Sequence, residues 1–503
     1  MAQQKKQWGA IIVMILLFAM IAFVTNLCSP MALIIKNQGT IPEWLTQIGN
    51  YGNFVAYLVM GIPAGMLISK FGYKKTALIG LAVGILGILI QWYSGQLDAQ
   101  KNLGLVFGVY LAGAFIAGFC MCILNCVVNP MLNILGGGGN TGNQLIQTGG
   151  VFNSAAAVAV YILMGALIGD VTKAKIADAT PALLIALGIF VVAFIVILFT
   201  KIEEPEQAPV DTKLIGGALK YRHFTLGALA IFLYMGIEVG VPNYINFFLT
   251  ADTPEMIQKK ADLLTNIEGT EAPNLDEAAK SYVALYTDMD KIQNGSDVKE
   301  KEKLQKDISD IKSRLEKKEL TAEKISQSPS GRGIDAATAG LIVAVYWLMM
   351  LVGRFVGASI GGKISSRAMI TTVSIMTIVL VAFGMFAPQD MLVNVPGIDW
   401  AKLQLTWTKV PVGIFAFILV GLCTSVMWGG IFNMAVEGLG KYTAVASGIF
   451  MTMVFGCAVM LAIQSTVAGF AGYMQSYWVV LFCAAYILFY ALVGSKPSKK
   501  AEE

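Results

Sequence analysis

The sequence predicts an all-α membrane protein with twelve transmembrane helices in two six-helix bundles. The first observation is composition, since 56% of the 503 residues are hydrophobic and only 14% are charged. A soluble domain has about a quarter of its residues charged. The second is that a window of about 20 residues, the length that crosses a bilayer, finds twelve apolar segments. They are 8–28, 49–69, 76–95, 104–132, 148–169, 181–200, 224–249, 336–362, 370–387, 409–435, 443–470 and 476–494.

The short loops between these segments indicate the orientation. If the N-terminus is cytoplasmic, the inner loops and tails hold fifteen Lys and Arg residues and the short outer loops hold six. Positive residues favour the cytoplasmic side, so both termini are expected inside a cell inner (plasma) membrane. The first segment is long, is followed by another span and has no evident cleavage site, so we interpret it as a retained helix.

Two polar stretches divide the chain. Residues 1–200 form an N-terminal six-helix bundle, and the linker 201–222 follows it on the cytoplasmic side. Span 7 occupies 223–250 and is separated by a long insert, 251–335, from spans 8–12 and a cytoplasmic tail in 336–503. The insert holds eighteen acidic and fourteen basic residues. On this topology we expect it to be external and soluble.

The insert carries helical patterns. Thr253-Pro254-Glu255 is a helix start signal for a helix near 254–267. Apolar residues at helical spacing then predict two further helices, in a hairpin that turns at Asn294-Gly295. The two stripes are Leu275, Ala279, Tyr282, Tyr286 and Met289, then Leu304, Ile308, Ile311 and Leu315. One interpretation is a solvated cap without chemistry, and the other is a gating domain or a domain that binds a protein partner.

Short motifs in both halves follow the order and spacing of a known family. In the first half they are Pro63-Ala-Gly65 with Lys70, Tyr73 and Lys74, then Asn129-Pro130, then Val151-Phe152-Asn153. In the second half they are the segments 229–239, Tyr346-Trp347, 352–357 and 431–440. Together they resemble the fucose:proton symporter family of the major facilitator superfamily, everywhere except in the insert. The resemblance implies an alternating-access fold and sugar uptake, which protons drive in the family's best-known members.

The sequence departs from that family at two positions where the resemblance implies a titrating carboxylate. Asn125 occupies one of them, in span 4, and Ser29 occupies the other, late in span 1. Neither side chain titrates near neutral pH. Three explanations remain: Glu238 carries the proton, another ion drives transport, or the protein is a facilitator.

Glu238 is the only Asp or Glu outside the insert that lies in the middle of an apolar segment. A carboxylate at that depth is a functional candidate, because burial favours the neutral form and can bring proton exchange near neutral pH. The alternative is that Glu238 only bonds neighbouring helices. Arg354 is the only cation inside a span, and pairing with Glu238 is one hypothesis. Its position toward the cytoplasmic end of span 8 favours a structural clamp.

A sugar site needs amides and hydroxyls for ring hydroxyls and aromatic faces for the C–H surface. Asn residues inside spans also indicate a wet cavity, because they are costly in lipid. The predicted substrate-binding residues are Asn26, Ser29, Asn125, Asn129, Asn153, Asn243, Asn246, Trp347, Trp428, Asn433 and Gln464. The predicted gate or structural residues are Lys70, Lys74, Arg354 and Glu437.

Other chemistry is not indicated. All seven Cys lie in spans and His223 is the only histidine, so we expect no metal site and no cofactor. No ATPase motif or catalytic constellation indicates an enzyme, and we expect no nucleic-acid partner. The leading interpretation is a secondary transporter that imports a sugar or sugar-like molecule. The alternative is a sensor or receptor on a transporter fold, which signals through the external insert.

Overall fold

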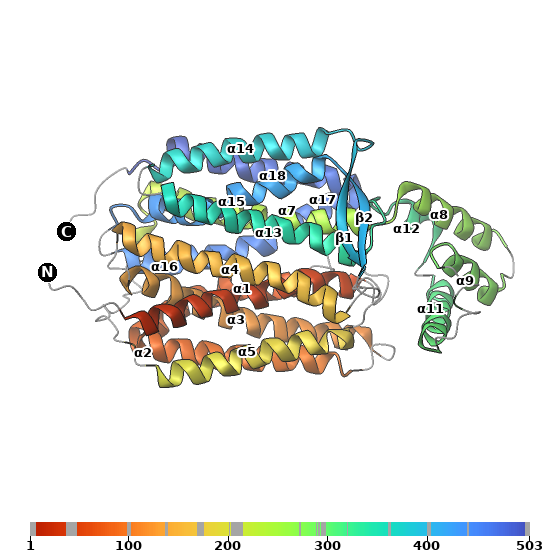
Figure 1. Cartoon of the computed structure of the whole chain (residues 1–503), viewed down its shortest axis with the longest axis horizontal. Helices are drawn as coiled ribbons and strands as arrows, with labels where there is room; N and C mark the ends of the chain where they lie inside the picture. Colours follow the sequence, from red (N-terminus) through yellow and green to blue (C-terminus); the bar gives the residue numbers. More distant parts are fainter. Residues whose placement is uncertain are drawn as a thin grey trace.

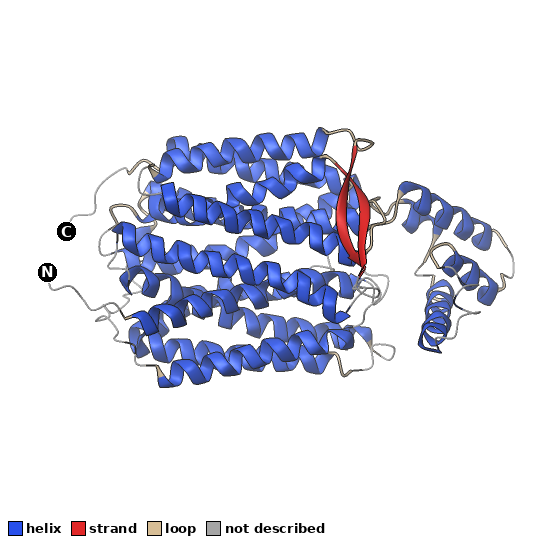
Figure 2. Cartoon of the chain, in the orientation of Figure 1, coloured by secondary structure: helices blue, strands red, loops and turns tan. Residues whose placement is uncertain are grey.

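The computed structural model is almost entirely helical, with one two-stranded sheet (Figure 2). It describes residues 7–36, 48–97, 102–135, 139–168, 176–200, 202, 215–270, 273–287, 289, 292, 298–318, 320–360, 364–399, 404–439 and 442–497. The predicted turn at Asn294-Gly295 and most of the linker 201–222 lie outside these ranges. Within them, eleven helical segments are long and apolar enough to cross a membrane, and a shorter apolar helix spans Thr148–Met164.

The first half of the bundle contains six membrane segments in five long helices. They are α1 (Trp8–Lys36), α2 (Ile48–Ser94), α3 (Leu103–Leu135), α4 (Gly139–Ile168) and α5 (Thr180–Phe199), with a short 3-10 helix η3 (Ile176–Ala179) before α5. Two predicted spans lie within α2, which turns at Gly72, where φ is 80°. Glycine adopts that left-handed conformation without a steric penalty. The Lys74 ammonium, just beyond this turn, donates to the Leu198 carbonyl at 3.0 Å and so links α2 to the end of α5.

The second half contains the other six membrane segments, so the predicted twelve-helix arrangement in two bundles is confirmed. Its elements are α6 (Ile215–Ala218), α7 (Arg222–Thr250), α13 (Ala336–Ile360), α14 (Ser366–Phe386), α15 (Gly413–Val436), α16 (Thr443–Thr452), η6 (Met453–Phe455), α17 (Gly456–Ala471), α18 (Tyr473–Phe489) and η7 (Tyr490–Gly494). The two halves lie side by side, with α1 to α5 below and the second half above in Figure 1.

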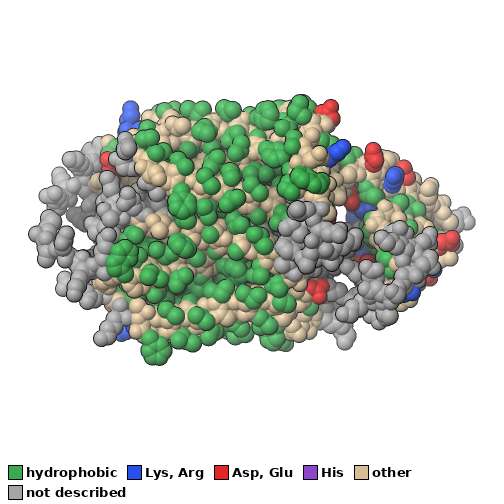
Figure 3. Space-filling view, in the orientation of Figure 1, with side chains coloured by type: hydrophobic (Ala, Val, Ile, Leu, Met, Phe, Trp, Pro, Cys, Tyr) green, Lys and Arg blue, Asp and Glu red, His purple; other side chains and the backbone are tan. Residues whose placement is uncertain are grey.

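The outer surface of the helical body is apolar. Val192, Val379 and Phe470 are 60%, 60% and 76% exposed. On the face shown in Figure 3, hydrophobic side chains cover the body, whereas charged side chains lie at its two ends and on the unit beyond it. Such a surface is suited to lipid, because a continuous exposed apolar belt is rare on soluble proteins.

Residues 404–411 correct the predicted start of span 10. We predicted that this span begins at 409, but α15 begins at Gly413 and strand β2 (Gln404–Pro411) precedes it. Strand β2 pairs antiparallel with β1 (Leu392–Asp399). The apolar residues at the end of β2 run directly into those of α15, so hydropathy alone does not separate strand from helix.

Between α7 and α13 lies a small helical unit with its own apolar core. It consists of α8 (Pro254–Glu268), α9 (Leu275–Ala284), α11 (Val298–Glu316) and α12 (Ala322–Ser326). Leu264, Val283 and Ile311 are in its core. The unit lies beyond one end of the helical body, which we call the insert side; α1 begins at the opposite end, which we call the terminal side (Figure 1).

The segment that leads from this unit back to α13 is bonded to the end of α7. The backbone amides of Arg332 and Ile334 donate to the carbonyls of Phe248 and Leu249 at 2.9 and 2.8 Å. The ammonium of Lys260 lies 2.6 Å from a carboxylate oxygen of Asp252, just after α7. These bonds attach the unit firmly to the second half.

Candidate functional site

A polar cavity lies between the two halves. Its volume is about 120 Å³, and its walls come from α1, α2, α3 and α4 of the first half and from α7, α13, α15, α16 and η6 of the second. The polar and aromatic side chains that line it are Thr25, Asn26, Asn50, Phe54, Tyr57, Asn125, Asn129, Asn153, Glu238, Trp347, Arg354 and Trp428. A cavity with amides, one hydroxyphenyl group and aromatic rings offers both kinds of contact that a sugar needs.

The cavity brings together most of the predicted site residues but not all of them. Asn243 and Asn246 are buried elsewhere in α7, and Gln464 donates to the Ser476 hydroxyl at 3.4 Å. Asn433 is exposed, on α15. The side chain of Ser29 lies outside the part of the chain that the structure describes.

Asn125 and Asn129 of α3 form one polar wall with a residue that the sequence analysis missed, Tyr57 of α2. The Asn125 amide donates to the Tyr57 hydroxyl at 2.8 Å, and the Asn129 amide donates to the Asn125 carbonyl at 3.0 Å. Oδ1 of Asn129 is buried and has no hydrogen-bond donor among the described residues. Buried polar atoms almost always have a partner, so this oxygen has an unused capacity to accept a hydrogen bond from water or from a ligand.

Asn153 and Asn26 differ in how the protein holds them. Nδ2 of Asn153 donates to the Phe18 carbonyl of α1 at 2.9 Å, and its Oδ1 accepts a hydrogen bond from the Arg354 guanidinium at 3.3 Å. Asn26 donates to the Ala22 carbonyl of its own helix at 2.8 Å. Asn153 therefore connects three helices, whereas the bond of Asn26 stays within α1.

Glu238 lies deep in α7 and keeps accessible surface, because it faces the cavity. The guanidinium of Arg354 and the hydroxyl of Tyr234 interact with its carboxylate, and the Cys457 thiol also lies near it. The Tyr346 hydroxyl donates to the Glu238 backbone carbonyl at 3.2 Å, which helps to fix α7 against α13. Glu238 and Arg354 are the only charged side chains among the described residues that line the cavity.

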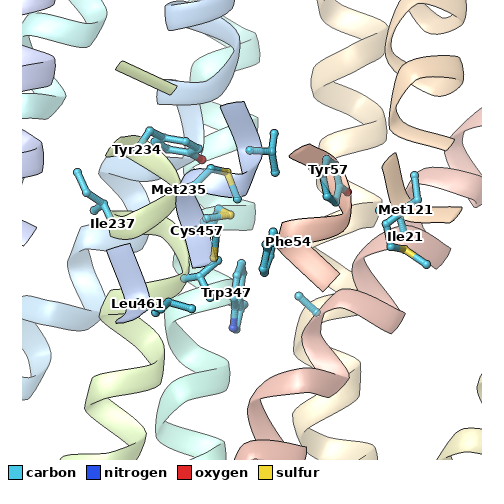
Figure 4. Close-up of a cluster of buried hydrophobic side chains, with 14 of the residues drawn as sticks. Ile21, Phe54, Tyr57, Met121, Tyr234, Met235, Ile237, Trp347, Cys457 and Leu461 are labelled. Carbon is cyan, nitrogen blue, oxygen red and sulfur yellow. The ribbon is translucent and has the colours of Figure 1, made fainter. Parts of the chain in front are cut away.

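Aromatic side chains from both halves meet at the cavity. Figure 4 shows Phe54 and Tyr57 of α2 on one side, facing Met235 and Trp347 of the second half. Trp347 is held by an edge contact with the Tyr346 ring at 5.4 Å. Its indole N–H is buried and has no acceptor among the described residues. An aromatic face with an unpaired donor can contact both the C–H surface and a hydroxyl of a sugar.

The remaining predicted gate residues lie away from the cavity. Lys70 lies over the Phe71 ring, 5.3 Å from its centroid. Glu437 is exposed at the end of α15, and its backbone carbonyl lies 2.8 Å from Nε2 of His223. These residues lie toward the terminal side, as expected for positions near the ends of their spans.

A second hollow, of about 550 Å³, is lined by α1, α4 and α5. Every lining residue is apolar or glycine, and Leu16 and Val192 there are more than half exposed. It has no group that could bond a hydroxyl, so it is a lipid-facing groove and not a sugar site.

The two six-helix halves and the cavity between them have the arrangement of the major facilitator fold. The chain is similar in structure to the Escherichia coli fucose:proton symporter, with a TM-score of 0.61 at 16% identity over 97% of this chain and 98% of that one. It is also similar to the D-xylose-proton symporter, with a TM-score of 0.58 at 10% identity over 98% and 99% of the two chains. These likenesses establish the fold.

In sequence, the chain is 25% identical over 504 residues to a glucose/galactose transporter of Brucella abortus, covering 98% of this chain and 96% of that one. It is 24% identical over 258 residues to the L-fucose-proton symporter of Haemophilus influenzae, covering 44% and 57%. No family model matches the chain. The resemblance noted from the motifs is therefore confirmed by independent comparisons of sequence and structure.

Proposed function

We propose that this protein imports a neutral monosaccharide by alternating access across the inner (plasma) membrane, with both termini cytoplasmic. The observation that carries the proposal is the cavity between the halves, with its amides, its unpaired Asn129 oxygen and its unpaired Trp347 N–H. The relatives named as glucose/galactose and fucose transporters support a hexose or deoxyhexose as the substrate class. A site at the interface of two bundles is the arrangement that rocking transporters use.

The charges of the cavity favour a neutral substrate. Glu238 and Arg354 compensate each other, so a neutral sugar leaves no charge unpaired. While Glu238 is charged, a sugar acid would add a second negative charge to a cavity in which Arg354, the only cation among the described lining residues, already faces a carboxylate. An uncompensated buried charge is strongly destabilising.

For energy coupling we propose a proton carried by Glu238. Asn125 lines the cavity as an amide, so among the described residues there Glu238 is the only carboxyl group. A sodium ion is a poor fit at this carboxylate, because the Arg354 guanidinium faces it and repels a second cation. A proton avoids that repulsion by neutralising the carboxylate.

Counterflow in proteoliposomes tests the transport function without any assumption about the ion. Vesicles loaded with unlabelled galactose, glucose or fucose should take up the same labelled sugar in a saturable way. Specific binding of these sugars without any flux would contradict a transporter and favour the sensor alternative. Saturable exchange of other solutes only, with none of these sugars, would contradict the proposed substrate class.

A further inference from the structure

Arg354 has more hydrogen-bonding capacity than the protein uses. Its Nη1 donates to the Gly150 carbonyl and, at 3.3 Å, to Oδ1 of Asn153, both on α4. The side chain is 8% exposed and lines the cavity. A guanidinium has five N–H donors in a fixed plane, and among the described residues no acceptor bonds Nε or Nη2.

The only charged group that faces this guanidinium is Glu238, yet the two side chains form no ion pair within 4 Å among the described residues. The other groups that interact with Arg354 are the Tyr234 and Tyr346 hydroxyls, on α7 and α13. Cys457 of α17 also faces Glu238. The cavity residues contributed by α15, α16 and η6 are Trp428, Met451 and Val454, none of which titrates. The free donors of Arg354 therefore have two candidate acceptors: the carboxylate of Glu238 and a ligand in the cavity.

We propose that Arg354 binds the sugar directly, with Nε and Nη2 donating to hydroxyl oxygens, and that the charged form of Glu238 competes for those donors. This inference rests on the proposed function. Nη1 keeps the guanidinium plane fixed against α4, so the other nitrogens are pre-oriented for a bidentate contact. Protonation of Glu238 removes the competing acceptor. Proton binding and sugar binding then favour each other, which is the linkage that a symporter needs.

Equilibrium sugar binding to the purified full-length protein, measured across the neutral pH range, tests the proposal. Wild type should bind galactose more tightly as pH falls. Arg354→Gln should weaken binding about 10- to 100-fold at low pH, the effect of losing hydrogen bonds to a charged donor, and should remove the pH dependence. Arg354→Lys, which keeps the charge and one donor direction, should restore part of both.

A set of monodeoxy sugars separates direct contact from a structural effect. If Arg354 touches the sugar, Arg354→Gln weakens the binding of at least one deoxy sugar clearly less than it weakens the binding of galactose, because one contacted hydroxyl is already absent. Arg367→Gln is the matched control, since the Arg367 guanidinium bonds the Ser495 hydroxyl at 3.1 Å and does not line the cavity. It should leave both affinity and pH dependence unchanged.

Two results would overturn the proposal. One is equal weakening by Arg354→Gln for galactose and for every deoxy sugar, which would make Arg354 a structural brace. The other is a pH dependence that persists in Arg354→Gln. Failure of the proposed function looks different, because wild type itself would then bind no sugar or would bind it without counterflow.

Discussion

The bond between Asn125 and Tyr57 gives the sharpest test of the sugar site. Tyr57→Phe keeps the ring and removes the hydroxyl that accepts from the Asn125 amide at 2.8 Å. In the sugar complex little water remains to replace that partner, so an unpaired amide costs about 1–3 kcal/mol. Since 1.4 kcal/mol is a factor of ten, we expect sugar affinity to fall about 5- to 150-fold.

A double-mutant cycle measures whether the two residues act as a unit. Asn125→Ala should weaken binding to a similar degree, and the double variant should differ from the sum of the singles by about 0.5 kcal/mol or more. The assay is equilibrium binding of labelled galactose, with Asn394→Ala, an exposed position on β1, as the control. Wild-type affinity in either single variant, or strictly additive losses, would refute the reasoning.

The remaining predictions concern motion, topology and the insert. A Cβ atom at Gly61 would lie 2.8 Å from the backbone nitrogen of Thr452, on α16 of the facing half. Gly61→Val should therefore disfavour contact between the halves at this point by about 1–3 kcal/mol, and spin labels placed across it should lie farther apart. Gly108→Val, where the added side chain meets open space, should leave these distances unchanged. Lys259→Cys, at an exposed position on α8, should react with an impermeant thiol reagent added outside intact cells. The seven native cysteines are buried, so they should give little background labelling. Protection of the new cysteine from the external reagent would place the insert on the cytoplasmic side and contradict the proposed topology. Lys260→Ala should make proteolysis of the insert faster, because it removes the ion pair between Lys260 and Asp252, whose charged atoms lie 2.6 Å apart. Sugar exchange should be unchanged. A loss of sugar exchange would indicate that the insert takes part in gating.

The sequence predicted the helices and part of the candidate site because both depend on local patterns. A span requires about 20 apolar residues, and an Asn inside one indicates water or a partner. Asn125, Asn129 and Asn153 were found in that way, and they do line the cavity.

The sequence could not predict which way each polar side chain faces. Each residue turns about 100° around a helix, so Asn243, five residues beyond Glu238 on α7, points about 140° away from it and lies outside the cavity that Glu238 lines. Tyr57 was missed because tyrosines in spans also occur at lipid interfaces. The hairpin before α15 was missed because its last apolar residues merge with the helix.

The role that we propose for Arg354 goes beyond the predicted structural clamp. Its sequence position, near the end of a span, favoured a structural clamp. The structure places its guanidinium in the cavity wall, bonded to α4 and facing Glu238. The long Arg side chain extends from near the end of its helix toward the cavity. The position of the residue in the sequence does not show in which direction that side chain extends.

The most direct test of the whole account is sugar-driven proton movement in proteoliposomes. Adding external sugar to wild-type vesicles in weakly buffered medium should make the medium more alkaline, and replacing sodium should not alter this. Glu238→Gln, which keeps the shape but cannot titrate, should abolish the pH change while counterflow continues, and Asp390→Asn, an exposed carboxylate outside the cavity, should behave as wild type. A sugar-driven pH change that persists in Glu238→Gln, or that is absent from wild type, would contradict proton coupling through this cavity.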